Sequence, residues 1–507
     1  MEYVIGIDLG TSSVKVLLVN QQGAVKHSVS KDYPLLQQQP GYSEQDPEEW
    51  VQKTIQALKQ LITEAQVPSD SIKGISFSGQ MHGLILLDDH QQVIRNAILW
   101  NDTRTTPQCK KIDQQLGGKL LEITKNPALE GFTLPKILWV KEHEPEHLRR
   151  TSVFLLPKDY LRYRMTGELN MEYSDAAGTL MLDIVNKSWS TDILRTFDIP
   201  AHICPPLVET ENCIGTLSPE FARVTGLNPA TKVFAGGADN ACGAIGAGIL
   251  SEGKALCSIG TSGVFLSYED NKHRNFGGKV HLFNHGQKDS YYTMGVTLAA
   301  GYSLSWFKET FAEHESFSSL LEEAALSPIG ANGLIFTPYL VGERTPYADA
   351  KIRGTFTGID GSHKRHDFVR AVIEGIVFSI NESVEIFRNY GKTIDTVISI
   401  GGGAKSDLWL QIQADIFNTK VIKLQNEQGP GMGAAMIAAT GLGWFPSLKE
   451  CAETFISIAK TYEPNPEHVS RYKAFYQVYK DVYPQTVAIN HQLFDLRMMD
   501  SSTVLAK

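Results

Sequence analysis

A short strand–turn–strand motif occurs twice in the chain, and it restricts the fold more than any other feature. Residues 9–19 read LGTSSVKVLLV and residues 259–268 read IGTSGVFLSY, each after a strand-like segment. In both copies glycine gives the backbone freedom that a tight turn needs, and threonine and serine place hydroxyl and N–H groups beside it. The copies lie half a chain apart in 507 residues, so we expect two related domains.

Strand-like and helix-like segments alternate along the rest of the chain. Helical patterns cover residues 47–65, 366–390 and 406–418, and strand-like runs such as IKGISFSG and TVISIGGG lie between helical segments. Such alternation is typical of α/β domains. A glycine-rich segment near residue 245 provides a boundary, which predicts domains at 1–245 and 246–507.

Composition excludes several classes of protein. The net charge is -9 and no lysine- or arginine-rich block is present, so nucleic acid is not an expected partner. The first residues lack the basic region of a signal peptide, and no run of about 18 apolar residues exists, so no membrane partner is expected. The six cysteines are scattered without a CxxC pair, which favours reduced thiols in a cytoplasmic protein.

Two motifs resemble functional patterns but do not satisfy them. HEPEH, residues 143–147, matches a zinc-protease pattern, but Pro145 would break the helix on which that pattern depends. GILSEGKA, residues 248–255, approaches a phosphate loop, but it ends in Ala255 and leads into a strand instead of a helix. Neither motif is expected to bind a metal or a nucleotide.

The two glycine-rich turns are suited to hold phosphate. Backbone N–H groups in tight turns form anion-binding concavities, and hydroxyl groups add further donors. Asp8 directly precedes the first turn, where a carboxylate can bind the magnesium ion that accompanies phosphates. The alternative is that Asp8 only caps the turn.

Two further glycine-rich segments follow strands. Residues 401–415, GGGAKSDLWLQIQAD, predict a strand–loop–helix contact with a ligand, although Ser406 can simply cap the helix. GGADNA, residues 236–241, places Asp239 where an ionised carboxylate can accept a proton from a substrate hydroxyl; the alternative is an ordinary turn aspartate. A similar segment at residues 428–439 is interpreted as a tightly packed helix.

Two polar and aromatic clusters suit a polyol, because they combine an apolar face with several hydrogen-bonding groups. Gln80, Met81 and His82 lie between two glycines at a strand end. The alternatives there are a turn histidine and a packing methionine. Trp100, Asn101 and Asp102 end another strand-like run, with Arg104 following.

Taken in order, the motifs DLGTSSVK, SGQMHG, LWNDTR, GGADNA, SIGTSG, GERTPYADAKIRG and GGGAKSDLW resemble the FGGY family of carbohydrate kinases. The resemblance spans roughly residues 4–445. SGQMHG, PGYSEQDPEEW, LPKDYLRYRMTGE and PYLVGERTP are similar to the branch of the family that acts on D-xylulose.

The resemblance implies two actin-like (ribonuclease H-like) domains that flank a deep cleft, with sugar bound mainly by the first domain and ATP mainly by the second. The implied reaction is transfer of the γ-phosphoryl group of ATP, with Mg²⁺, to the 5-hydroxyl of D-xylulose, giving D-xylulose 5-phosphate and ADP. The last helical segment is expected to pack back near the interdomain region, and the final residues, DLRMMDSSTVLAK, to form a disordered tail. Family members are often dimers, which leaves a homodimer open.

The resemblance also assigns residues. Asp239 matches the catalytic base, and Asp8 and Asp239 are the expected metal-binding carboxylates. Sugar contacts are expected from the two polyol clusters and the residue after the base: Gln80, Met81, His82, Trp100, Asn101, Asp102 and Asn240. Phosphate and nucleotide contacts are expected from the glycine-rich turns and the adenine–ribose end of the pocket: Thr11, Ser12, Lys15, Gly260, Thr261, Ser262, Gly301, Ser305, Gly402, Gly403 and Asp407. Asp407 stands where relatives often have asparagine, which can donate as well as accept a hydrogen bond.

Three other functions remain open at this point. One is a kinase of the same family for another ketose such as ribulose, a polyol, or gluconate. A second is an actin-like or chaperone-like ATPase switch that binds protein. A third is a sugar-binding regulator without catalysis, although the presence of both Asp8 and Asp239 disfavours it.

Overall fold

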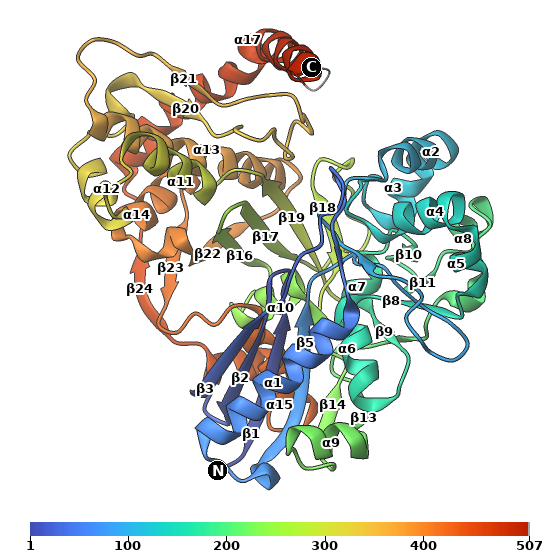
Figure 1. Cartoon of the computed structure of the whole chain (residues 1–507). Helices are drawn as coiled ribbons and strands as arrows, with labels where there is room; N and C mark the ends of the chain where they lie inside the picture. Colours follow the sequence, from blue (N-terminus) through green and yellow to red (C-terminus); the bar gives the residue numbers. More distant parts are fainter. Residues whose placement is uncertain (505–507) are drawn as a thin grey trace. The chain divides into compact units, whose positions relative to one another are not determined.

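The computed structural model describes the backbone of residues 1–504 and the side chains of residues 1–498. The chain forms two compact units (Figure 1). Unit 1 comprises Met1–Leu250, Tyr268–Tyr292 and Gln428–Ser457, and unit 2 comprises Ser251–Ser267, Thr293–Glu427 and the chain from Ile458 onward. Two segments distant in sequence therefore complete the first unit.

A seven-stranded sheet forms the centre of unit 1, in the order β13-β14-β5-β1-β2-β3, with β15 also pairing with β5. Strand β1 is antiparallel to β2 and parallel to β5. The strands are β1 (Tyr3–Leu9), β2 (Ser13–Asn20), β3 (Val25–Asp32), β5 (Ile72–Gly79), β13 (Cys213–Thr216), β14 (Lys232–Phe234) and β15 (Gly237–Ala238).

Helices cover both faces of this sheet. Alternate residues of β1, such as Ile5 and Ile7, join Trp50 of α1 (Pro47–Ala65) in one buried cluster. Val4 joins Met432 of α15 (Pro430–Gly441) in another. Because side chains alternate between the faces of a strand, both faces of β1 are buried, which explains its nearly continuous apolar sequence.

Helix α15 lies unusually close to the sheet and to α10 (Asp239–Gly246). A Cβ atom added to Gly6 of β1 would lie 2.1 Å from the carbonyl oxygen of Gly431, and one added to Gly433 would lie 1.9 Å from the carbonyl oxygen of Cys242 in α10. Only glycine permits these backbone approaches. The interpretation of residues 428–439 as a tightly packed helix is confirmed, because Gly431–Thr440 are all buried.

The rest of unit 1 consists of short helices and two-stranded sheets that pair β4 with β7, β6 with β8, β9 with β12, and β10 with β11.

Helix α4 (Thr133–His143) ends before α5 (Pro145–Arg150) begins, so the two histidines of HEPEH are not on one continuous helix. The remaining elements are β4 (Glu44–Gln45), β6 (Ile85–Leu87), β7 (Ala97–Ile98), α2 (Thr106–Leu116), α3 (Gly118–Thr124), β8 (Val153–Leu155), α6 (Pro157–Thr166), β9 (Met171–Glu172), α7 (Tyr173–Ala177), β10 (Leu182–Asp183), β11 (Ser188–Trp189), α8 (Thr191–Thr196), β12 (Leu207–Val208), α9 (Pro219–Thr225), α16 (Leu448–Phe455), and 3-10 turns at Ser69–Ser71 and Ala201–Ile203. Strand β18 (His281–Asn284) is instead the edge strand of the second seven-stranded sheet, of order β18-β19-β17-β16-β22-β23-β24.

Unit 2 repeats the central strand arrangement of unit 1. Strand β16 (Gly253–Ile259) is antiparallel to β17 (Gly263–Glu269) and parallel to β22 (Ile394–Gly401), as β1 is to β2 and β5. The irregularity in the parallel pairing also falls after the first residue of the strand in both units. The prediction that the two GTS turns open related folds is therefore confirmed.

The sheet of unit 2 continues from β22 to β23 (Lys420–Leu424) and β24 (Ile458–Tyr462). Helices α13 (Arg365–Asn389) and α14 (Asp407–Phe417) confirm the two predicted helical segments within a residue or so at each end. Helix α17 (Pro466–Val504) contacts α13, α14 and β20, and it extends through most of the expected tail, whose last residues, 505–507, lie outside the described part. The other elements are β19 (Tyr291–Thr297), α11 (Gly301–Phe311), α12 (Phe317–Ala324), β20 (Ile335–Thr337), β21 (Thr355–Thr357), and 3-10 turns at Ala331–Gly333 and Gly402–Lys405.

Among the described residues, no helix combines the length and the apolar composition that crossing a membrane would need.

The glycine contacts of α15 generate a stability prediction. We expect Gly433→Ala to lower the free energy of unfolding by about 3 kcal/mol, because its Cβ would overlap a backbone oxygen that cannot move aside. Thermal unfolding followed by circular dichroism measures this. Gly118→Ala is the matched control, since nothing lies within 4 Å of an added Cβ there. Equal melting temperatures for the two variants would contradict the close approach.

Candidate functional site

Strand register brings the two predicted carboxylates to the same edge of the unit 1 sheet. Asp8 of β1 pairs with Ser78 of β5, and Ser78 pairs with Gly237 of β15. Asp239 follows β15 directly as the first residue of α10. Because β1, β5 and β15 are parallel, these residues all lie where the strands end at their carboxyl side, the usual place for ligands in α/β sheets.

Both carboxylates are held in an environment that favours their neutral form. The pKa of Asp239 is raised to about 7, first by burial and second by the negative charge of Asp8. Burial also raises the pKa of Asp8 to about 6, although the Ser78 hydroxyl and the Lys15 ammonium act in the opposite direction. Two neighbouring acids with raised pKa values are a frequent sign of a functional site, because catalytic acids and bases need pKa values matched to their task.

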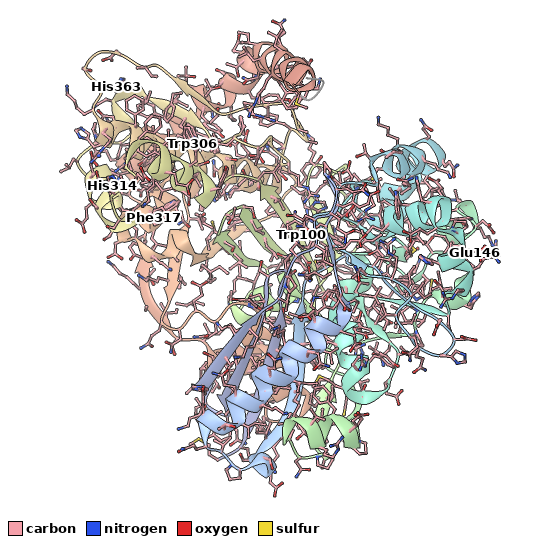
Figure 2. The ribbon with its side chains drawn as sticks, viewed as in Figure 1. Trp100, Glu146, Trp306, His314, Phe317 and His363 are labelled. Atoms are coloured by element: carbon pink, nitrogen blue, oxygen red, sulfur yellow. The ribbon has the colours of Figure 1, made fainter. Side chains whose placement is uncertain are left out.

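The first glycine-rich turn is held by hydrogen bonds around Thr11. Gly10 donates its N–H to the carbonyl oxygen of Ser13 at 3.0 Å. The indole N–H of Trp100, a half-exposed side chain (Figure 2), donates to the Thr11 hydroxyl at 2.8 Å. Thr11 in turn donates to the side-chain oxygen of Gln80 at 3.3 Å. The structure thus joins the predicted phosphate turn to both predicted sugar loops.

Lys15 and Ser12 lie on the same hairpin. The Lys15 ammonium donates to the side-chain oxygen of Gln428, just before α15, at 3.0 Å. The Ser12 carbonyl oxygen accepts a hydrogen bond from the N–H of Tyr33 at 3.1 Å, which leaves the exposed Ser12 side chain outside this contact. Gln428 is a site neighbour that the sequence analysis did not identify, since only the folding of 428–457 onto unit 1 brings it there.

Met81 is a buried residue whose sulfur contacts two polar groups. Its sulfur lies 3.7 Å from the side-chain amide of Asn240 and 3.8 Å from the hydroxyl of Tyr292. Asn240 also donates to the Asp239 carboxylate at 3.0 Å, which ties the predicted sugar contacts to the predicted base. Tyr292 was missed in the sequence because no motif surrounds it; it reaches this position through the segment 268–292.

His82 adopts a left-handed backbone conformation, with φ of 70°. Its Nδ1 lies 2.6 Å from the carbonyl oxygen of Gly178, so Nδ1 carries the proton and donates. The ring packs 4.7 Å from that of Phe132, and the Thr133 hydroxyl donates to the His82 carbonyl oxygen at 3.0 Å. The imidazole is therefore fixed in position and in tautomer.

Asp102 is held by an arginine and a backbone N–H. Its side chain is fully buried, and it accepts hydrogen bonds from the Arg104 guanidinium at 2.6 to 3.0 Å and from the Ser43 N–H at 2.6 Å. Asn101 accepts from the Ser43 hydroxyl at 2.8 Å. Gln80 is likewise buried and contacts Gln45. The side chains of Asp102 and Gln80 therefore both have hydrogen-bond partners within the protein.

In unit 2 the predicted nucleotide residues converge at the end of β16. The N–H of Gly301 donates to the carbonyl oxygen of Gly260 at 2.8 Å, and Tyr302 donates to that of Thr261 at 3.1 Å. A Cβ added to Gly401 or Gly403 would lie 2.6 Å from an atom of Ile259. The start of α11, with Ser305 one turn further, thus contacts the turn 260–262, and the 401–403 loop contacts Ile259 just before that turn.

Asp407 begins α14 and is engaged by cationic and phenolic groups. Lys460 donates to its carboxylate at 2.6 Å and Tyr462 at 2.7 Å. These hydrogen bonds hold the pKa of Asp407 below its usual range. The carboxylate of Asp407 is therefore paired with a local cation, Lys460.

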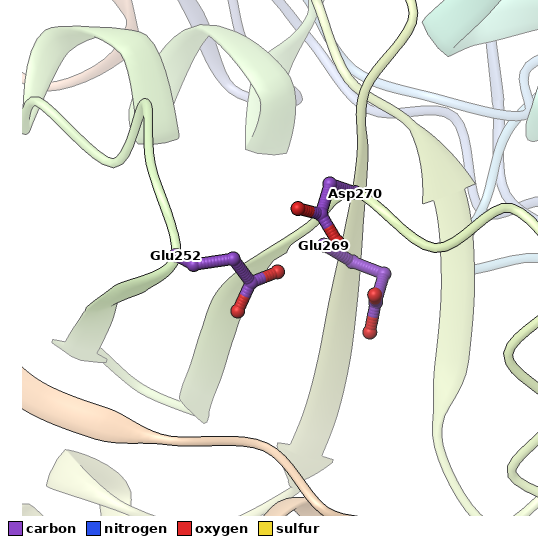
Figure 3. A group of neighbouring side chains, drawn as sticks. All are labelled: Glu252, Glu269 and Asp270. Carbon is purple, nitrogen blue, oxygen red and sulfur yellow. The ribbon is translucent and has the colours of Figure 1, made fainter.

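Figure 3 shows three acidic side chains at the other end of the β16–β17 hairpin: Glu252, Glu269 and Asp270. Glu269 pairs with Arg274 at 2.5 Å, and Glu252 lies 3.7 Å from the Lys392 ammonium. We assign no metal to these residues, because cations of the protein already pair with Glu252 and Glu269, and exposed acidic groups are common without a metal.

The chain matches the models of one protein family over most of its length. Residues 3–246 match the N-terminal domain and residues 255–442 the C-terminal domain of the FGGY family of carbohydrate kinases. A xylulose kinase of Bacillus subtilis is 64% identical over 497 residues, which cover 98% of this chain and 100% of that protein.

Solved structures show the same fold. A crystal structure named as a kinase of xylulose ("xyloylose") from Brucella ovis superposes with a TM-score of 0.90 at 34% identity, covering 96% of this chain and 100% of that one. A gluconate kinase from Lactobacillus acidophilus reaches 0.92 at 28% identity, covering 97% and 99%. The predicted pair of actin-like domains is confirmed.

The raised pKa values predict a pH-dependent cost in stability. Between about pH 4 and pH 7 the unfolded chain loses the Asp239 proton first, so the folded state is progressively destabilised as the pH rises. Asp239→Asn removes this cost. We expect the variant to gain about 4 kcal/mol over the unchanged protein at pH 8 and little at pH 4.

Melting temperatures of the ligand-free protein across this pH range measure the difference. Asp89→Asn is the matched control, because the Asp89 side chain is 82% exposed. A stability gain for Asp239→Asn that is the same at pH 4 and pH 8 would show that burial does not perturb this carboxyl group.

Proposed function

Since the chain belongs to the FGGY family of carbohydrate kinases, we propose that it transfers the γ-phosphoryl group of ATP to the 5-hydroxyl of D-xylulose. The products are D-xylulose 5-phosphate and ADP. The observation that carries the substrate assignment is the 64% identity, over nearly the whole chain, to a xylulose kinase.

Asp239 is the general base of the proposed reaction. A catalytic base is most effective when its pKa lies near the working pH, and burial raises that of Asp239 to about 7. It takes the proton of the 5-hydroxyl as the oxygen bonds to phosphorus. Asn240 fixes the carboxylate by donating to Oδ1 from both its backbone N–H, at 2.7 Å, and its side chain.

The residues present fit Mg²⁺. Asp8 and Asp239 offer carboxylate oxygens, the ligand type that this ion prefers, and the repulsion between them is relieved by a cation. We propose that these two residues hold the ion directly or through water. When bound, Mg²⁺ neutralises charge on the phosphates of ATP.

The remaining predicted residues divide by unit. In unit 1 we propose that Met81, His82, Trp100, Asn101 and Asn240 contact the sugar, with the buried Gln80 and Asp102 holding these contacts in place. Thr11, Ser12 and Lys15 donate to phosphate oxygens. In unit 2 the proposed nucleotide contacts are the residues that converge at the end of β16, together with the start of α14: Gly260, Thr261, Ser262, Gly301, Ser305, Gly402, Gly403 and Asp407.

A second candidate is a kinase of the same family for another ketose, a polyol or gluconate. It is favoured by the superposition with a gluconate kinase, which is as close as that with the kinase from Brucella ovis. The fold therefore does not select the sugar, and the side chains around Met81 and His82 must do so.

Two further properties belong to the proposal. We place the enzyme in the cytoplasm, where ATP is available and cysteines stay reduced; all six cysteines are unpaired. A homodimer is the oligomeric state to test, by light scattering of the purified protein.

The substrate assignment predicts a clear ranking of sugars. We expect kcat/KM for D-xylulose to exceed that for L-xylulose, D-ribulose, L-ribulose, gluconate and glycerol by at least about tenfold. Coupled ADP release with Mg²⁺–ATP measures the ranking. Another sugar in first place would overturn the substrate and leave the kinase activity standing, whereas equal ADP release with and without every sugar would contradict the kinase itself.

If Asp239 is the base, replacing it should lower turnover and leave the protein folded. Asp239→Asn removes the proton acceptor at nearly unchanged volume, so we expect kcat to fall by at least about 100-fold. The same coupled assay measures it, and nucleotide binding followed by calorimetry should persist. Asp89→Asn again serves as control. A kcat within a few-fold of the unchanged protein would exclude Asp239 as the base.

A further inference from the structure

Two fully buried residues, Glu172 and Ser174, hold the backbone in front of Asp239. The N–H of Ala238 donates to the Ser174 hydroxyl oxygen at 2.9 Å. The same hydroxyl donates its proton to the Glu172 carboxylate, whose two oxygens each lie 2.8 Å away. We call Glu172 and Ser174 the clamp. Because the carboxylate takes the hydroxyl proton, the Ser174 oxygen is left as an acceptor for the Ala238 N–H.

The clamp is itself fixed. Glu172 caps the N-terminus of α7 by accepting from the N–H groups of Ser174 and Asp175 at 2.7 and 2.8 Å. The Lys158 ammonium lies 3.2 Å from Glu172 and 2.8 Å from both Asp159 and Asp175, and all these side chains are buried. A buried network of paired charges is costly to rearrange. Ser174 therefore presents its oxygen at a well-defined point.

The opposite side of the same backbone is held by the sheet. Gly237 and Ala238 pair with Ser78 and Gly79 of β5. A Cβ added to Gly237 would lie 3.1 Å from the sulfur of Cys242 and 3.5 Å from the Ser174 oxygen. The peptide that precedes Asp239 is thus confined between strand β5 and the clamp.

We propose that Ser174 is a positioning residue, which sets the location of the Asp239 carboxylate through the Ala238 N–H. This rests on the proposed function, because that function makes Asp239 the base. Without the hydroxyl, the Ala238 N–H is a buried donor with no acceptor and pulls the start of α10 away from its place. A misplacement of about 1 Å in a reacting group can cost about 100-fold in rate.

The clamp predicts a larger effect on turnover than on sugar affinity. Among the proposed sugar contacts, only Asn240 lies on α10 and shifts with Asp239, whereas His82 is held by a different group, the Gly178 carbonyl oxygen after α7, and by packing on Phe132. Removing the Ser174 hydroxyl leaves the contacts of His82 in place. A general loss of structure would disturb both sets of contacts together.

The experiment is a kinetic comparison of Ser174→Ala with the unchanged full-length protein, using Mg²⁺–ATP and the sugar with the highest turnover. We expect kcat to fall about 10- to 100-fold while KM for the sugar and for ATP changes less than about threefold. Sugar binding measured by calorimetry without nucleotide should be equally preserved. The matched control is Ser190→Ala: Ser190 is also buried in unit 1 and accepts from a backbone N–H, that of Ile193, at 3.3 Å.

A kcat of Ser174→Ala within twofold of the unchanged protein, or a change confined to KM, would overturn the positioning role. If the alanine variant does not fold, Ser174→Cys decides, since a thiol keeps the volume but accepts hydrogen bonds weakly; a drop in kcat of at least about fivefold at constant KM is then expected. Absence of sugar-dependent ADP release from the unchanged protein would instead contradict the proposed function.

Discussion

The parallel register of β1, β5 and β15 is the constraint on which the site depends. It sets Asp8, Ser78 and Gly237 in one row, so that Asp239 can begin a helix beside Asp8 without any long connecting loop. A shift of one residue in this pairing would turn Asp8 to the opposite face of the sheet, among the apolar residues that pack on α1. The two carboxylates are thus neighbours because of backbone pairing, not because of their own interactions, which are repulsive.

The same arrangement requires close packing behind the site. Asp239 begins α10 and Asp8 lies beside Gly431 of α15, and these helices contact each other and the sheet through glycines at positions 6, 431 and 433. Such tight backbone contact leaves little room for water, and burial is what raises the pKa values of Asp8 and Asp239. The left-handed His82 adds a further local cost. Stability lost at the site is offset by the apolar clusters on both faces of the sheet.

Local sequence predicted the elements but not the contacts between distant segments. Helix α1 could be predicted because Pro47 and the apolar stripe through Trp50 mark its start and buried face, and the GTS turns could be predicted from glycine and hydroxyl residues alone. The burial of Asp102 against Arg104 could not be predicted, because the sequence around an acidic residue at a strand end does not show whether its side chain faces solvent or a guanidinium group. Tyr292, Gln428 and Ser174 act through tertiary packing, which no motif around them records.

The repeat explains how one strand framework came to hold two kinds of proposed contact. In unit 1 the loop after β5 carries Gln80, Met81 and His82, and in unit 2 β22 ends at Gly401 and is followed by Gly402 and Gly403, where backbone can approach a nucleotide. The turns also differ: Leu9 pairs with Val14, whereas Ile259 pairs with Gly263, so the second turn is one residue shorter.

The charged residues follow the same division. Asp8 and Lys15 flank the first turn, while the sequence-equivalent positions around the second turn are Ser258 and Phe265. A carboxylate and an ammonium are therefore supplied by one turn only, which leaves the second turn to contact its ligand through backbone N–H and hydroxyl groups. The proposed reaction uses this asymmetry, because the proposed metal ligands and the proposed base all belong to unit 1, whereas Gly260, Thr261 and Ser262 of the second turn carry no carboxylate or amine.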